Sequence, residues 1–289
     1  MTSAIQRAIG FVHREGRVLE RRILEAALEG GAAEPVGDAL RGYQNSDGGF
    51  GWGLEPDKRA PSSQPLDVEI AWQSLDWAGI APRELIEPAC DYLASIGSGV
   101  SCVTERVREH PHAPHWSDAS PEPSLNPTAS LAGYLWKWSI DHPWRAAATD
   151  FCWSVLIDGP PDDAHSAVCV LRFLEHVPDR DRARAVIDAL HPKLPTLNWL
   201  HYDPAAEGYG VSPLQLVPSP DSPWSDLFPL EVLESHLDRL ESTQVDDGGW
   251  ELTWPTIGPG AISEWRGRRT LENLLVLRAC GRWPSGSER

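Results

Sequence analysis

The chain has 289 residues, a formal net charge of −17 and a sequence pI of about 4.9, which disfavours nucleic acid and anionic membranes as partners because both attract basic surfaces. No apolar run approaches the roughly 18 residues of a bilayer span, and the first residues lack a signal-peptide core, so we expect no integral membrane protein. Five cysteines without a CxxC pair favour reduced thiols and a cytoplasmic location.

Helical periodicity recurs along the chain and strand alternation is scarce, so we predict an all-α fold. Apolar stripes predict helices over residues 18–28, 131–138, 230–240 and 270–281. Asn126 is expected to cap the second of these, with Pro127 at its first helical position, and Gly281 to end the last. Altogether the pattern predicts roughly ten or eleven helical segments of about 10–16 residues.

Two long connections, residues 110–127 and 201–224, are rich in proline and aromatic residues. Structureless connections of this length are uncommon in compact domains, and these contain too many aromatic residues for solvated linkers. We therefore expect one domain over residues 1–289, with both connections folded over it.

One loop occurs twice. The stretch QNSDGGFG (44–51) returns as QVDDGGW (244–250), 200 residues later. The paired glycines allow a tight turn with positive φ, and the glutamine amide can tie the preceding helix end to backbone groups. In both copies the loop is followed within about twenty residues by another helix, as expected for repeated helical hairpins in a closed ring or an open solenoid.

These loops resemble the Gln–Trp repeats of squalene–hopene cyclases and other class II terpene cyclases, and the Gly-Gly-Phe-Gly repeats of protein prenyltransferase β subunits. The likeness extends through APSSQPLDVEIAWQSL (60–75), which is similar to the inner-helix starts of that superfamily. The resemblance implies an α/α toroid, a ring of helical hairpins with inner and outer helices around a central cavity. Our leading hypothesis for the function is an apolar, isoprenoid substrate that undergoes acid-initiated cyclisation or isomerisation, and we expect no cofactor.

In such toroids the residues between a glycine loop and the next inner helix reach the cavity mouth. Arg59 falls near the diphosphate-binding histidine of the prenyltransferases, and a guanidinium forms forked bonds with a diphosphate. Alternatively, the arginines neutralise carboxylates, as in the pairs Glu55–Arg59 or Glu264–Arg268. The predicted substrate-binding residues are Arg59, Trp116, Asn126, Trp254, Glu264, Trp265 and Arg266.

Class II cyclases protonate their substrate with an Asp-x-Asp-Asp pattern, whose nearest match here is residues 160–163. Asp162 and Asp163 match the last two acids, but Pro160 replaces the first. Asp162 is thus one candidate donor, although both acids can equally cap a helix. The other candidates are Glu55 and Asp57, one of which should have a raised pKa if both face an apolar mouth; the alternative is a salt-bridged loop with Lys58 and Arg59.

His110, His112, His115 and Asp118 could bind a transition metal, but a surface histidine cluster is commoner, and we expect no metal. The faces of Trp116, Trp254 and Trp265 could stabilise a carbocation, or simply pack. Two rival functions remain open. One is a carbohydrate-active α/α-barrel enzyme with stacking tryptophans and two carboxylates, and the other is a non-catalytic binding or scaffold protein.

Overall fold

The protein is all-α, as predicted. The computed structural model describes residues 3–283, and these residues contain no β-strand, only isolated bridges between loops. No helix in this part of the chain is both long and apolar enough to cross a membrane. The α-helices are α1 (Ala4–Glu15), α2 (Val18–Leu28), α3 (Glu34–Arg41), α4 (Pro65–Trp77), α5 (Arg83–Ile96), α6 (Pro114–Ser117), α7 (Leu125–Lys137), α8 (Pro143–Leu156), α9 (Ala164–His176), α10 (Arg180–Leu190), α11 (Pro213–Leu216), α12 (Leu230–Ser242) and α13 (Pro259–Ala279).

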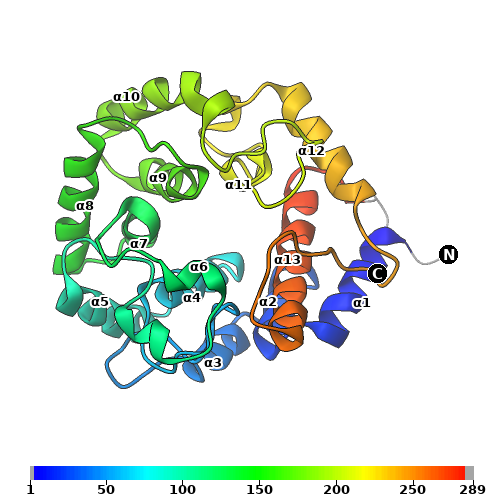
Figure 1. Ribbon diagram of the computed structural model, residues 1–289, viewed down its shortest axis with the longest axis horizontal. Coiled ribbons are helices and arrows are strands. Elements are labelled where there is room, and N and C mark those ends of the chain that lie inside the picture. Colours follow the sequence, from blue (N-terminus) through cyan, green and yellow to red (C-terminus); the bar gives the residue numbers. More distant parts are fainter. Residues whose placement is uncertain (1–2, 284–289) are drawn as a thin grey trace.

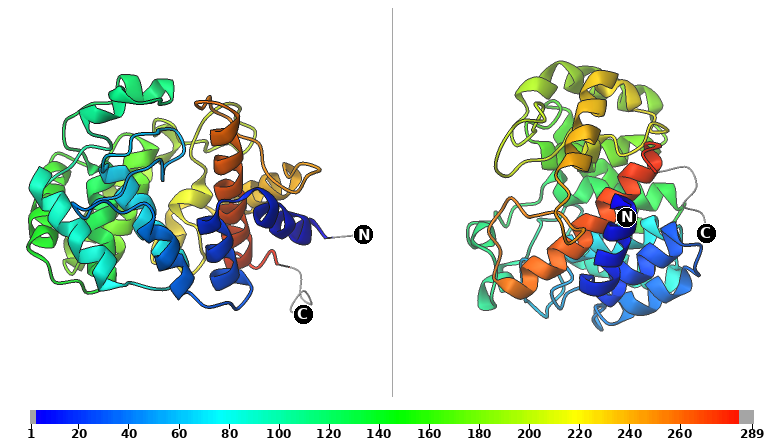
Figure 2. Two further views of the ribbon diagram at one scale, coloured as in Figure 1. Left: turned by 90° about the horizontal axis from the view of Figure 1, so that it is seen from below. Right: turned by 90° about the vertical axis from the view of Figure 1, so that its right-hand side faces the viewer.

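The helices follow one another around the molecule (Figure 1). Helices α5, α8, α10 and α12 lie on the outside, whereas α4, α7, α9 and α11 lie nearer the middle. Neighbouring inner helices pack against each other in the order α13, α2, α4, α7, α9 and α11. The last helix, α13, packs beside the first two, α1 and α2, as all the views show (Figures 1 and 2). The toroid itself remains an interpretation based on the repeats.

Large aromatic side chains fill the space between the inner helices. Trp72 on α4 is fully buried and meets Trp138 edge to face, with ring centroids 6.0 Å apart. Trp138 stacks on the buried Tyr134 of α7 at 5.0 Å, and the Arg172 guanidinium of α9 lies 4.7 Å from the Tyr134 centroid. Such aromatic contacts add to the burial of apolar surface and hold three inner helices together.

Two helix starts differ from the prediction. Asn126 does not cap α7 with its side chain, because its Oδ1 lies 3.6 Å from the Cys169 thiol and its backbone is non-helical just before Pro127. The last helix begins at Pro259, eleven residues before the predicted start, because Gly258 ends the loop and proline is favoured in the first helical turn. Residues 264–269 therefore lie on α13 and not in a loop.

The two Gly-Gly loops have the same hydrogen bonds. Gln44 Nε2 donates to the Gly48 carbonyl at 2.9 Å, and Gln244 Nε2 donates to the Gly248 carbonyl at 2.9 Å. The backbone N–H of Gly49 donates to Asp47 Oδ1 at 3.0 Å, and that of Gly249 to Asp247 Oδ1 at 2.9 Å. The repeat in the sequence is thus a repeat in structure.

The loops also dock on equivalent neighbours. Gln44 donates to the Leu85 carbonyl of α5 at 3.0 Å, whereas Gln244 donates to the Ala4 carbonyl of α1 at 2.9 Å. Helix α1 therefore takes the place beside α13 that α5 takes beside α4. The N-terminal helix completes the hairpin that the C-terminal helix begins.

Replacing Gly48 with alanine should cost more stability than the same change at Gly79. Both glycines have positive φ, 88° and 71°, so both variants carry backbone strain of about 1–3 kcal/mol. A Cβ at residue 48 would also lie 2.1 Å from the Pro88 carbonyl oxygen, whereas a Cβ at residue 79 meets nothing within 4 Å. Urea denaturation of both variants measures the difference. Equal losses would show that the close approach to α5 is unimportant.

Candidate functional site

Two loops that precede inner helices pair with each other at one edge of the molecule. The Arg59 backbone N–H donates to the Pro111 carbonyl at 2.9 Å, and that of Ala113 donates to the Asp57 carbonyl at 2.7 Å. The pairing fixes the segment that precedes α4 against the segment that carries α6. It brings His115 and Trp116 of α6 next to the acidic residues of the first glycine loop.

Beneath this pairing lies a buried charge cluster made of Glu55, Asp57, Lys58 and Asp67. All four residues are at most 3% exposed. Lys58 Nζ donates to Glu55 Oε2 at 3.0 Å and to Asp67 Oδ1 at 2.9 Å. Asp67, in the first turn of α4, also accepts the Glu55 backbone N–H at 2.8 Å. One ammonium group thus bonds to two of the three carboxyl groups, Glu55 and Asp67, so the cluster itself is short of positive charge.

Burial raises the pKa of Glu55 to about 7, because the loss of hydration and the nearby Asp57 and Asp67 together outweigh the attraction of Lys58. Burial likewise raises the pKa of Asp67, in spite of Lys58. The pKa of Lys58 is raised as well: burial opposes its charge, but the two carboxylates it contacts more than compensate. With a pKa of about 7, the Glu55 carboxyl takes up and releases a proton near neutral pH.

Changing Glu55 to glutamine should make stability less dependent on pH. The folded-state pKa of Glu55 lies above its ordinary value, so its stabilising contribution is present below about pH 4.5 and is lost as the pH rises through about 7. Between pH 5 and 8 the wild type should lose up to roughly 1.4 kcal/mol per pH unit relative to Glu55→Gln. Urea titrations across this range test the slope, and parallel curves would contradict the raised pKa.

Aromatic rings cover the cluster on one side. The Trp254 indole Nε1 donates to Asp57 Oδ2 at 2.9 Å, and His115 Nε2 lies 3.9 Å from the same oxygen. Trp265 of α13 packs edge to face on Trp254, with centroids 5.3 Å apart. Asp57 Oδ1 is buried without a hydrogen-bond partner. The predicted Glu55, Asp57, Trp116, Trp254 and Trp265 are thus gathered in one place, and they come from four separate segments of the chain.

A chain of aromatic contacts continues from Trp254 to the surface. Tyr209 lies 5.7 Å from the Trp254 centroid, its hydroxyl is 3.0 Å from His165 Nε2, and it is 40% exposed. Next to it is Trp199, 59% exposed with a positive φ of 64°. Residues held in sparsely populated backbone regions cluster at active sites and ligand contacts.

The sequence analysis missed four members of the site: Asp67, His165, Tyr209 and Trp199. Asp67 and His165 sit in the first turns of α4 and α9, where acidic or polar residues usually cap helices. The long loop 201–224 was expected to fold over the domain, but nothing in its pattern singled out Tyr209. Only the three-dimensional contacts distinguish these residues from caps and packing.

The two arginines predicted to bind substrate, Arg59 and Arg266, lie in different places. Arg59 is paired with Glu264 of α13 at 2.9 Å, with both side chains about 30% exposed, so it lies beside the aromatic cluster. Arg266 points instead to the second glycine loop, where its Nη2 donates to both carboxylate oxygens of Asp247 at 2.9 and 2.8 Å. Arg266 thus stabilises the loop. The predicted alternative, carboxylate neutralisation, describes Arg59 and Arg266 well, although their partners differ from those expected.

Two other predicted residues, Asp162 and Asn126, are not part of the acidic cluster. The Asp162 side chain is exposed, and its neighbour Asp163 caps α9 by accepting the Ser166 N–H at 3.0 Å. Helix capping was the alternative considered for this pair, and Asp163 performs it. Asn126 contacts Cys169 on α9, as described above.

The donor atoms of Glu55, Asp57 and His115 lie within 4.8 Å of one another, a spacing compatible with a shared cation. Lys58 already occupies one oxygen of Glu55, and its positive charge opposes a cation there. The remaining histidines do not join the set: His112 bonds through Nδ1 to the His110 carbonyl at 2.7 Å and through Nε2 to Ser117 Oγ at 3.1 Å. We assign no metal to the site, and the expectation of none stays a prediction.

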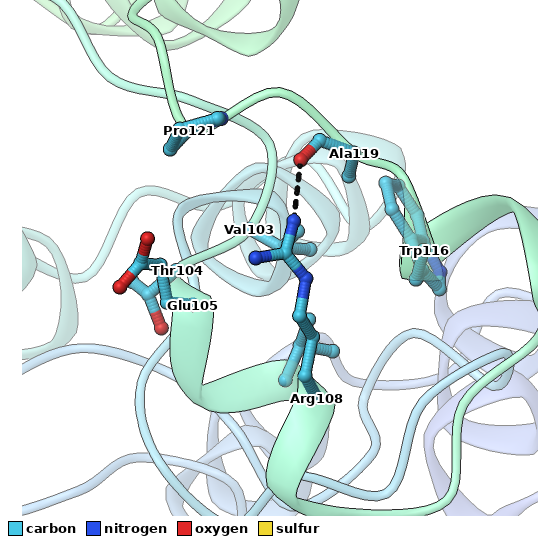
Figure 3. A pocket seen from close by; sticks show the side chains of 8 residues that line it. Val103, Thr104, Glu105, Arg108, Trp116, Ala119 and Pro121 are labelled. Atoms are coloured by element: carbon cyan, nitrogen blue, oxygen red, sulfur yellow. Dashed lines mark hydrogen bonds between the residues drawn. The ribbon is translucent and has the colours of Figure 1, made fainter.

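A crevice too narrow to hold a water molecule lies against Trp116, between the 3₁₀ helix η1 (Glu105–Glu109) and residues 117–121 (Figure 3). Arg108 reaches across it and donates to the carbonyls of Ser117 and Ala119, both at 3.1 Å. These bonds keep the segment with His115 and Trp116 folded against the acidic cluster.

No family model matches the chain, and no curated protein matches it by sequence. The chain is similar in structure to a protein from Actinoplanes solved by crystallography, with a TM-score of 0.57 and 15% sequence identity over 96% of this chain and 98% of the other. At this identity the likeness shows a shared fold and nothing about chemistry.

Proposed function

We propose that the protein is an enzyme that transfers a proton to a small, largely apolar substrate of the isoprenoid class, and so starts a cyclisation or isomerisation. The observation that carries the proposal is the Glu55–Asp57 pair, which is buried against tryptophan rings and short of positive charge. A buried acid whose pKa is raised, as that of Glu55 is, is typical of general acid catalysis.

In this proposal the pair holds the proton and Asp57 delivers it, because Asp57 has an unpartnered oxygen and is hydrogen-bonded to the Trp254 ring. The proton adds to a substrate carbon, leaving a carbocation that the faces of Trp254 and Trp265 stabilise by about 0.5–2 kcal/mol each. Loss of a proton from a neighbouring carbon to the carboxylate regenerates the acid. The reaction is redox-neutral and needs no cofactor.

A proton-transfer assay in D₂O tests the proposal directly. The protein is incubated with geraniol, with farnesyl and geranylgeranyl diphosphates and with squalene, and the products are analysed by mass spectrometry. Protonation at carbon should give isomerised or cyclised products that carry deuterium from the solvent. If all four compounds are recovered unchanged and unlabelled, the isoprenoid proposal is wrong.

A carbohydrate-active enzyme is the second candidate. The exposed rings of Trp199 and Tyr209 next to two carboxyl groups favour it, because sugar rings stack on aromatic faces and glycosidic bonds are cleaved by carboxyl pairs. An acid with a pKa of about 7 also suits protonation of a leaving-group oxygen near neutral pH. Release of reducing ends from a panel of oligosaccharides would favour this candidate over the first.

A further inference from the structure

Buried polar atoms without partners are concentrated at the candidate site. Among the described residues, six side-chain nitrogen or oxygen atoms are buried without a hydrogen bond. Four of them belong to the charge cluster and its aromatic cover: Asp57 Oδ1, Asp67 Oδ2, Trp116 Nε1 and Trp265 Nε1. Each such atom costs about 1–3 kcal/mol, so a folded protein rarely keeps several together unless something else satisfies them.

The chemistry of these atoms restricts what can satisfy them. The two indole nitrogens only donate, and an ionised carboxylate oxygen only accepts. A cation leaves both indole N–H groups without an acceptor, and a hydrocarbon serves none of the four atoms. An ether or carbonyl oxygen serves the indoles but not the carboxylates. A hydroxyl group accepts from an indole N–H and donates to a carboxylate, so it matches both kinds of atom.

The contacts place both kinds of atom around the same residues. Trp265 packs on Trp254, whose indole nitrogen bonds to Asp57. On the other side, the Trp116 ring lies 5.8 Å from Lys58 Nζ and 4.7 Å from the His115 ring, and His115 in turn approaches Asp57. Trp265 and Trp116 are thus each one contact removed from Asp57, Trp265 through Trp254 and Trp116 through His115.

We propose that the ligand of this site is an alcohol, whose free hydroxyl accepts a hydrogen bond from Trp265 or Trp116 and donates one to Asp57. The inference rests on the proposed function for its location and specifies the substrate class further: a hydroxyl must lie at the acid group. A terpenoid alcohol and a sugar both supply such a hydroxyl, and the aromatic rings are compatible with the remainder of either.

Calorimetric binding at pH 8 tests the inference with matched probes: geraniol, geranyl methyl ether and methyl β-glucopyranoside. The wild type should bind geraniol or the glucoside at least about fivefold more tightly than the ether, since one net hydrogen bond is worth about 1 kcal/mol. Preference for geraniol identifies a terpenoid alcohol, and preference for the glucoside identifies a sugar. Equal or absent binding of all three overturns the inference.

The variants Trp265→Phe and Trp116→Phe keep an aromatic ring and remove the N–H, so at least one should lose the alcohol preference. Trp136→Phe is the matched control, because its N–H donates to Thr149 Oγ1 at 3.0 Å away from the site; it should bind like the wild type. Retention of the preference in both site variants contradicts the inference. Preferential binding of an alcohol without any deuterium incorporation would support this inference and reject the proposed function. Deuterium-labelled products with no preference for the alcohol would support the proposed function and reject this inference.

Discussion

Replacing Lys58 with methionine should lower the free energy of unfolding by about 3–5 kcal/mol at pH 8. Lys58 is fully buried and is the ammonium group that Glu55 and Asp67 share, at 3.0 and 2.9 Å. Methionine fills much of the same volume but leaves buried carboxylates without a counter-charge. The loss should be smaller at pH 5, where Glu55 is protonated because its pKa is about 7.

Urea denaturation with two further variants separates this effect from simple loss of packing. Adding Asp67→Asn to Lys58→Met removes one uncompensated charge and should recover part of the loss. Lys137→Met is the matched surface control, since Lys137 pairs with Asp76 at 2.7 Å but is 40% exposed; it should cost at most about 1 kcal/mol. If Lys58→Met is no more harmful than Lys137→Met, the buried cluster is not held together by its charges.

Changing Asp57 to asparagine should reduce the rate of deuterium incorporation into product by about 10²–10⁴-fold. The amide keeps the size of the carboxyl group and an oxygen that can accept the Trp254 N–H, so the fold should persist. It cannot, however, exchange a proton with the substrate. Initial rates of the wild type and the variant, measured at equal folded concentration, give the ratio.

Asp162→Asn separates Asp162 from Asp57, two of the three candidate proton donors that the sequence left open. The Asp162 side chain is exposed, so the variant should keep wild-type rates. Loss of activity in Asp162→Asn, with Asp57→Asn fully active, would move the acid from the charge cluster to the start of α9. Circular dichroism spectra of both variants exclude unfolding as the cause.

The sequence was sufficient for those features that depend on local pattern. The helical periodicity predicted ten or eleven segments of about 10–16 residues; nine α-helices of the described residues fall in that range, and α3 is shorter and α13 longer. The Gly-Gly loops were recognisable because both copies need the same residues: in each, the glutamine side chain donates to the carbonyl of the first glycine. The helix over 259–279 was predicted too short because its first turns, rich in glycine, serine and arginine, show little apolar periodicity.

Pairings between distant segments could not be predicted in the same way. That Asp57 would meet Trp254 depends on 197 residues of intervening chain, and that Arg59 would pair with Glu264 depends on 205. From their charges and aromatic rings, these four residues could lie at a cavity mouth or equally well elsewhere on the surface. Arg266 illustrates this difficulty. It follows Trp265 directly in the sequence, yet its side chain bonds to Asp247 of the second glycine loop.

The contact between the two ends of the chain has a consequence for biosynthesis. Gln244 bonds to the Ala4 carbonyl across 240 residues, and Arg14 bonds to the Asp247 carbonyl at 2.9 Å across 233. During translation α1 therefore leaves the ribosome long before the segment that it packs against exists. Joining segments so far apart costs about 2 kcal/mol more chain entropy than joining segments about twenty residues apart. The hairpin of α1 and α13 therefore contains the first helix to be synthesised but is the last hairpin to form. Until α13 is synthesised, the nascent chain must keep the apolar face of α1 from contacts with other partners.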